Sequence, residues 1–271
     1  MKSIFDNVSF DCSVKVTKAY STSFSSAVKM LAPSIRQDIY NIYGFVRFAD
    51  EIVDTFHDYD KEALFSQFEN ELSLALSQRI SLNPILNSFQ HTVNKYNIPR
   101  EMIDAFMKSM KLDLSKSEYK TTEEYQEYIY GSADVVGLMC LKVFVNGNDE
   151  KYNELKDSAM RLGSAFQKVN FLRDLKADYE ELSRTYFPNT DLNHLDEKSK
   201  QEIISDIESG HVKYKIEAYY LGEKTLMNIN LDGRTIDFAS YSGLGLCTMF
   251  NEMIKYGSLV HGIDYYMELD N

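Results

Sequence analysis

The chain has 271 residues, 44% of them hydrophobic, and a formal net charge of -12 at pH 7. This apolar fraction is enough to bury a large core and excludes a disordered tail protein. The acidic balance argues against nucleic acid as a partner, because an acidic protein repels phosphate backbones. A phosphate-bearing ligand would need metal ions between its charges and the carboxylates.

The cysteines and the N-terminus bear on the compartment. Cys12, Cys140 and Cys247 are scattered and form no CxxC pair, which is typical of a reducing environment. The opening sequence MKSIFDNVSF lacks the apolar run of a signal peptide, and no stretch approaches the roughly 20 apolar residues that span a bilayer. We expect a cytoplasmic protein, with peripheral membrane contact as an option.

Helical periodicity dominates the chain. Apolar residues recur at three- and four-residue spacing, and four prolines and 12 glycines leave long stretches without breakers. No alternation of the strand type persists. The pattern therefore predicts an all-α protein with one domain over residues 1–271. In chain order, we expect helices over residues 34–55, 61–77, 84–96, 99–114, 121–145, 150–182, 205–227 and 240–256.

A first polar cluster lies inside the expected helix 34–55. Asp50 and Asp54 are four residues apart, so on a helix they share one face, about 6 Å apart along the axis. Like charges at this spacing destabilise a helix by about 0.3 kcal/mol, and a bound divalent cation would remove that repulsion. The alternative is a solvated acidic face with an Arg47–Glu51 ion pair.

A second cluster lies inside the expected helix 150–182. Asn170, Asp174 and Asp178 recur every four residues, with Arg173 beside them. Oxygen ligands of this kind suit Mg²⁺. Each cluster alone is compatible with a charged helix surface, whereas two such faces on separate helices favour one shared metal-bound ligand. We therefore predict Mg²⁺ as cofactor, held by Asp50, Asp54, Asn170, Asp174 and Asp178.

Three blocks of sequence resemble the squalene/phytoene synthase family. The first comprises YSTSF at residues 20–24 and YGFVRFADEIVD at residues 43–54. The second is YIYGSADVVG at residues 128–137, and the third is NFLRD at residues 170–174 followed by RTYFP at residues 184–188. The blocks follow the family's order. The resemblance implies an isoprenoid-synthase-type helical bundle around a central cavity.

The resemblance also implies roles for individual residues. The implied catalytic group is Arg47, Asp50, Asp54, Tyr128, Asn170, Arg173, Asp174 and Asp178. The implied substrate contacts are Ser21, Ser23, Phe24, Val28, Ala133, Gly137, Arg184 and Tyr186. The alternatives are helix capping for the two serines, a core tyrosine at position 128 and ordinary core packing for the apolar positions. Phe250 stands where the family usually has a tyrosine, which puts one substrate contact in doubt.

The activity that the resemblance implies is a head-to-head (1′–1) condensation of two prenyl diphosphates. We expect two geranylgeranyl diphosphates to give phytoene through a cyclopropyl (prephytoene) diphosphate, a step of carotenoid biosynthesis. One alternative is a squalene or dehydrosqualene synthase that uses two farnesyl diphosphates. A second is a catalytically inactive helical assembly protein of the same family.

Overall fold

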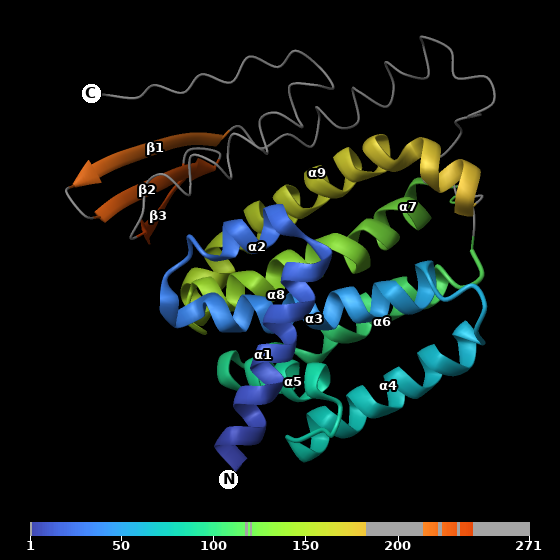
Figure 1. Ribbon diagram of the computed structural model, residues 1–271. Coiled ribbons are helices and arrows are strands. Elements are labelled where there is room, and N and C mark those ends of the chain that lie inside the picture. The colour runs from blue at the N-terminus through green and yellow to red at the C-terminus, as the bar shows by residue number, and fades with distance from the viewer. Residues whose placement is uncertain are drawn as a thin grey trace.

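The computed structural model describes residues 2–116, 119, 121–182, 214–221, 224–231 and 234–240, with side chains described as far as Phe171 apart from Ser23, Ala165 and Val169. The first 182 residues form a helical bundle (Figure 1). Its helices are α1 (Lys2–Tyr20), α2 (Thr22–Val28), α3 (Pro33–Asp54), α4 (Lys61–Gln78), α5 (Pro84–Tyr96), α6 (Arg100–Leu112), α7 (Thr122–Ile129), the π-helix η1 (Tyr130–Asp134), α8 (Val135–Phe144) and α9 (Asp149–Leu182).

The bundle confirms the predicted all-α fold class and six of the predicted helices. The signals at the helix starts are the expected ones: Asp60, Asn83 and Thr121 each accept a hydrogen bond from a backbone N–H of the first turn. Pro33 and Pro84 begin α3 and α5, where the missing N–H costs nothing.

Helix α1 was not predicted, because its buried face is polar. Ser9, Ser13 and Thr17, spaced four residues apart, are all buried. Their small side chains allow α1 to lie close to its neighbours: the Ser13 and Ser88 hydroxyls are 2.6 Å apart, and a Cβ at Gly44 of α3 would lie 3.1 Å from the Ser13 hydroxyl. Apolar periodicity has no signal for such a helix.

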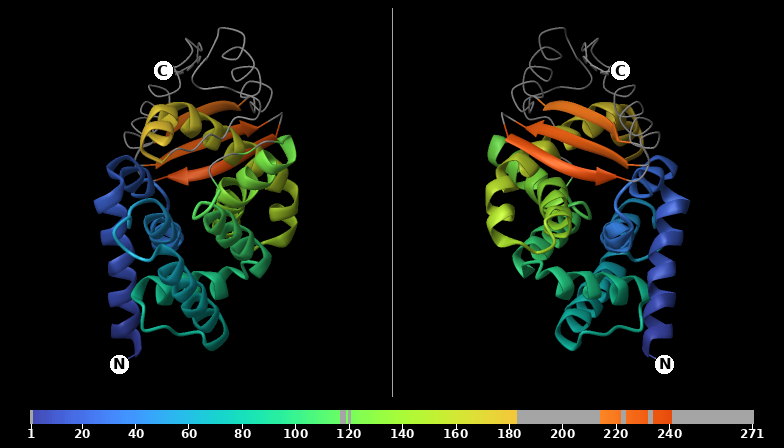
Figure 2. Two further views of the ribbon diagram at one scale, coloured as in Figure 1. Left: turned by 90° about the vertical axis from the view of Figure 1, so that its right-hand side faces the viewer. Right: turned by 90° about the vertical axis from the view of Figure 1, so that its left-hand side faces the viewer.

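Helix α3 is the centre of the bundle and contacts α1, α4, α5, α6 and α8. Phe45 is fully buried and stacks on Phe89 of α5, with ring centroids 3.9 Å apart. Ala49 and Val53 continue this buried face. Figure 2 shows α1 on one side of the bundle and α8 on the other, with α3 between them.

The described part of the chain also holds an antiparallel sheet of order β1 (Tyr214–Leu221), β2 (Lys224–Leu231) and β3 (Arg234–Ser240). The predicted helix 205–227 is therefore wrong over the strand residues that it contains. Leu221 pairs with Lys224 and Leu231 with Arg234.

The reason for the error can be read in the sequence. Two-residue spacers, Gly222-Glu223 and Asp232-Gly233, separate the strands, and such spacers favour hairpins. Apolar residues in β2 and β3 also alternate with polar ones. The predicted helix 240–256 lies outside the described residues beyond Ser240, and the single-domain assignment stays a prediction.

Candidate active site

The first polar cluster is organised around Arg47 of α3. Its guanidinium donates to the Asp50 carboxylate at 3.0 Å and also to Glu51. It lies over the ring of Tyr20, 4.6 Å from the centroid. Burial by itself would lower the pKa of Arg47, but the hydrogen bond to Glu51 and the charge of Asp50 raise this pKa above its ordinary value. The side chain is therefore held in place on three sides and stays charged.

One donor of Arg47 is unused. Nε is buried and has no hydrogen-bond partner within the described part of the chain. A buried polar group without a partner costs about 1–3 kcal/mol, so such groups are normally satisfied. Because guanidinium groups match phosphate oxygens well, a diphosphate would suit this donor.

Asp50 and Asp54 lie one turn apart at the C-terminal end of α3, as predicted. The Asp50 side chain is 35% exposed, and Asp54 is half-buried. Ala49 and Val53, which directly precede them, are fully buried. The two carboxylates thus stand at the edge of the core, where a bound cation would be only partly hydrated.

The α1–α2 junction places aromatic groups beside this cluster. Ser21 caps α2 by accepting the N–H of Phe24 at 3.1 Å, so its predicted capping alternative is observed. Phe24 stacks on Tyr43 of α3, with centroids 4.7 Å apart and rings 22° from parallel. Burial raises the pKa of the Tyr43 hydroxyl, which also interacts with Arg47. The side chain of Ser23 lies outside the described part of the chain.

The predicted wall positions fall at packed helix contacts. Val28 is 1% exposed and belongs to the main core cluster. Ala133 is half-buried in η1. Gly137 lies where α8 approaches α9, and a Cβ there would be 3.5 Å from the Ala159 carbonyl, an ordinary contact. The packing alternative therefore describes Val28 and Gly137 as they stand in the structure.

Tyr128 lies in a buried aromatic group beside the second cluster. Its hydroxyl donates to the Asp113 carboxylate at 2.9 Å, a partner on the loop after α6. Its ring lies 4.6 Å from that of Tyr119 and 6.1 Å from that of Phe171 of α9. Phe171, which directly follows Asn170 on α9, thus packs on Tyr128.

Helix α9 carries the second cluster. Asn170, half-buried, donates from Nδ2 to Gln167 at 3.4 Å. Because α9 is continuous to Leu182, positions 170, 174 and 178 share one helical face. The side chains of Arg173, Asp174 and Asp178 lie outside the described part of the chain, as do residues 184, 186 and 250 entirely.

The two clusters lie at the same end of the bundle. Figure 1 shows the C-terminal turns of α9 and those of α3 at this end, so the backbone arrangement is compatible with one shared ligand. Among residues with described side chains, no group of three His, Cys, Asp or Glu is placed to hold a metal. That two carboxylate pairs face one another across a cavity therefore stays a prediction.

Comparison with known proteins bears on this arrangement. A sequence profile described as squalene/phytoene synthase matches residues 17–212, which include both clusters and the Tyr128 segment. The chain belongs to the squalene/phytoene synthase family. The β1–β3 sheet lies beyond the matched residues.

Similar proteins include phytoene synthases and a diapophytoene synthase. Phytoene synthase 1 of Solanum lycopersicum is 28% identical over 186 residues, which are 68% of this chain and 45% of that protein. Phytoene synthase of Pseudescherichia vulneris is 29% identical over 177 residues, 62% and 56% of the two chains. 4,4'-Diapophytoene synthase of Staphylococcus haemolyticus is 26% identical over 199 residues, 71% and 66%. The chain spans about half the length of the first relatives.

Solved structures show the same fold. Squalene synthase HpnC from Alicyclobacillus acidocaldarius superposes with a TM-score of 0.66 at 22% identity, over 76% of this chain and 82% of that one. A dehydrosqualene synthase in complex with a ligand gives 0.66 at 21% identity, over 76% and 75%. The predicted isoprenoid-synthase-type bundle is thereby confirmed. No helix in the described ranges is long and apolar enough to cross a membrane.

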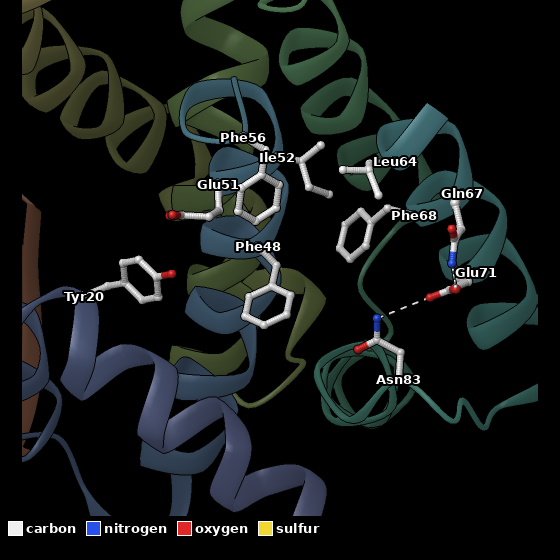
Figure 3. A pocket seen from close by; sticks show the side chains of 10 residues that line it. All are labelled: Tyr20, Phe48, Glu51, Ile52, Phe56, Leu64, Gln67, Phe68, Glu71 and Asn83. Carbon is white, nitrogen blue, oxygen red and sulfur yellow. Dashed lines mark hydrogen bonds between the residues drawn. The ribbon is translucent and has the colours of Figure 1, made fainter. Parts of the chain in front are cut away.

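A pocket of about 250 Å³ lies between α3 and α4 and reaches Tyr20 at the end of α1 (Figure 3). Phe48, Ile52 and Phe56 line it and recur every four residues. At 100° per residue, Asp50 lies 200° around the helix from Phe48, so its carboxylate points away from this pocket. Tyr20 and Glu51, which both contact Arg47, also line this pocket, so it borders the Arg47 cluster although Asp50 points away from it.

The sequence reasoning passed over several residues of this site. Tyr20 and Tyr43 stand within the first resembling blocks, yet only the structure shows them against Arg47 and Phe24. Asp113 carries no motif and is identified only by its hydrogen bond to Tyr128. Asp134, at the end of η1, is buried and accepts from Ser164 of α9. A π-helix such as η1 is often found at functional sites, but no sequence pattern indicates one here.

Proposed function

We propose that the chain condenses two geranylgeranyl diphosphates head to head to phytoene, through a cyclopropyl diphosphate. The observation that carries the proposal is the fixed guanidinium of Arg47, with a buried, unused Nε beside the carboxylate of Asp50. A cation next to a metal-binding carboxylate is what a diphosphate leaving group requires. The relatives named phytoene synthase support the choice of substrate.

The chain's residues would act mainly on the leaving groups. Each ionisation builds negative charge on a departing diphosphate, and Arg47 and Arg173 would neutralise its oxygens by charge-assisted hydrogen bonds. Magnesium, held by Asp50, Asp54, Asn170, Asp174 and Asp178, would supply further positive charge at the same oxygens. Hard oxygen donors of this kind fit Mg²⁺.

Exclusion of water is the second task. The first ionisation leaves an allylic cation. The double bond of the second prenyl diphosphate attacks this cation, and water would quench it. The Phe24–Tyr43 stack lies beside the Arg47 cluster, and together with Val28, which packs in the core, it would supply the apolar lining. We place the reaction in the cytoplasm, with release of the hydrocarbon at a membrane surface.

The direct test is diphosphate release from purified protein with Mg²⁺ and either C20 or C15 donor, together with the mass of the hydrocarbon. We expect release with geranylgeranyl diphosphate, a C40 product and no need for nicotinamide. A product that forms only with NADPH would contradict the proposal. Absence of release with both donors would favour the inactive assembly protein.

A dehydrosqualene-type activity on farnesyl diphosphate is the second candidate, because a relative is named diapophytoene synthase. Chain length then depends on the depth of the pocket. An extra isoprene unit buries five carbons at roughly 0.8 kcal/mol each, so a small change in depth has a large effect.

Val28→Phe tests this dependence on depth. Val28 is 1% exposed, and a larger side chain there would make the proposed substrate pocket shallower. We expect the ratio of kcat/KM for C20 over C15 donors to fall by at least about 10-fold, which is about a third of that burial energy. Val28→Ile, a smaller enlargement, is the matched control, and melting temperatures report overpacking separately. A wild type that prefers farnesyl diphosphate would decide for the C15 candidate.

A further inference from the structure

The contact between η1 and α9 contains a buried carboxylate that the candidate mechanism does not use. Asp134 ends η1 and is 6% exposed. Its Oδ1 accepts the hydroxyl of Ser164, a residue of α9, at 2.7 Å. The charge of Lys168, one turn further along α9, acts on the same carboxylate. A buried carboxylate is retained in a core only where such partners satisfy it.

The backbones approach closely at the same point. A Cβ at Gly163 would lie 3.2 Å from the Ala133 carbonyl oxygen, from Asp134 Cα and from Asp134 Oδ1. A glycine at this position therefore allows α9 to lie directly against η1. The hydrogen bond of the neighbouring Ser164 then fixes how α9 is rotated and how far it is shifted along its axis, because Asp134 is anchored in a different element.

This contact stands between two groups of the candidate active site. Tyr128 precedes η1 by two residues and packs on Phe171 of α9. Asn170 lies six residues beyond Ser164, about 9 Å along the helix axis. A rigid helix transmits any rotation at Ser164 to that distance, and a displacement of 1 Å at a reacting group is enough to cost about 100-fold in rate.

We infer that Asp134 is a positioning residue: through Ser164 it holds α9 so that Asn170, Asp174 and Asp178 are presented to the diphosphate with its metal ions. The inference rests on the proposed function. Partners that orient metal ligands, without touching the metal, typically contribute 10–100-fold to metal affinity or activity.

The test compares Asp134→Ala, Ser164→Ala and the double variant with wild type. The readouts are the Mg²⁺ concentration for half-maximal diphosphate release and the calorimetric dissociation constant of inorganic pyrophosphate in Mg²⁺. We expect both quantities to rise about 10-fold in each single variant. The double variant should lose no more than either single variant, because both remove one shared interaction.

Two control variants separate positioning from packing. Asp134→Asn keeps an oxygen that accepts from Ser164, so it should stay within about 3-fold of wild type, the cost of a modest hydrogen-bond change. Ser158→Ala removes a buried hydroxyl from the same helix and should leave both readouts unchanged. Variants with a lower melting temperature but a wild-type Mg²⁺ requirement would show a purely structural role and overturn the inference.

Calorimetry keeps this result distinguishable from a failure of the proposed function. If the wild-type protein releases no diphosphate from either donor, the proposed activity is contradicted. The dissociation constants of pyrophosphate for wild type and variants still decide the role of Asp134. Equal dissociation constants for wild type and Asp134→Ala, or no binding by wild type, overturn the positioning role.

Discussion

The two polar clusters are supported in different ways. On α3, Arg47 reaches Asp50 and Glu51 within one turn of its own helix. On α9, the segment that carries Asn170 is held by other elements, through the Asp134–Ser164 hydrogen bond. Charge pairs at three- and four-residue spacing form wherever the helix forms, whereas the second arrangement exists only in the folded bundle. The charge pairs of the first cluster are therefore a local feature of the sequence, whereas the placement of the helix segment that carries the second depends on tertiary packing.

Loss of a carboxylate from either cluster should lower activity to a similar extent, although the two clusters are held in place by different contacts. We expect Asp50→Ala and Asp174→Ala each to lower kcat for diphosphate release by about 1,000-fold, as for removal of one group that stabilises the developing charge. Excess chelator should have the same effect on wild type. Asp50→Ala relieves the repulsion with Asp54 but also removes an acceptor of Arg47, so the free energy of unfolding of the apo protein should change by less than about 1 kcal/mol. Asp58→Ala, an exposed acid beyond α3, is the control. A wild-type rate in either variant would show that the substituted carboxylate is not part of the active site.

Packing around η1 should be far less tolerant than packing around α8. A Cβ at Gly131 would lie 1.9 Å from the Ser109 hydroxyl and 2.6 Å from the Ala105 carbonyl, whereas one at Gly137 meets only an ordinary contact. We expect Gly131→Ala to lower the free energy of unfolding by about 3 kcal/mol, the upper range for overpacking. Gly137→Ala should be neutral or slightly stabilising, since alanine favours helices. Urea denaturation measures both, and equal stabilities would contradict the tight η1–α6 contact.

The buried carboxylate of the second region predicts a pH dependence. Burial raises the pKa of Asp134 to about 6, against the opposing effects of Ser164 and Lys168. The folded protein therefore binds the proton more tightly than the unfolded chain, whose aspartates titrate near pH 4. Stability from this group is complete below about pH 4 and is lost as pH rises through about 6. Relative to Asp134→Asn, the free energy of unfolding of wild type should fall by about 2 kcal/mol between pH 4 and pH 7. Parallel pH profiles would refute this.

The smallest effect concerns the ring beneath Arg47. Tyr20 lies on the guanidinium and is nearly half exposed, so its contribution should be about 0.5–1 kcal/mol. We expect Tyr20→Leu to lower kcat/KM about 3-fold, because a less restrained Arg47 meets the diphosphate less often in the right orientation. Tyr59→Leu, at a more exposed tyrosine, serves as the control. An unchanged kcat/KM would show that Asp50 and Glu51 suffice to hold Arg47.

The sequence by itself determined the helical class, six helices of the bundle and the family. Apolar spacing reports which face of a helix is buried, and motif order along the chain needs no coordinates. The same reasoning failed for α1, which buries Ser9, Ser13 and Thr17, and for the strands that replace part of the predicted helix 205–227. In α1 the apolar period of a helix is absent, because the buried face is polar. In the strand region, a two-residue period was interpreted as a helical one.

The tertiary structure alone decided the contacts between distant segments. Tyr128 with Asp113, Phe24 with Tyr43, and Asp134 with Ser164 join residues 15 to 30 positions apart. No local propensity encodes such a pair, because each depends on where two helices cross. The sequence thus supplied the charged groups of the candidate site, while their orientation follows from the packing of α3 on α8 and of α8 and η1 on α9, which only the folded chain possesses.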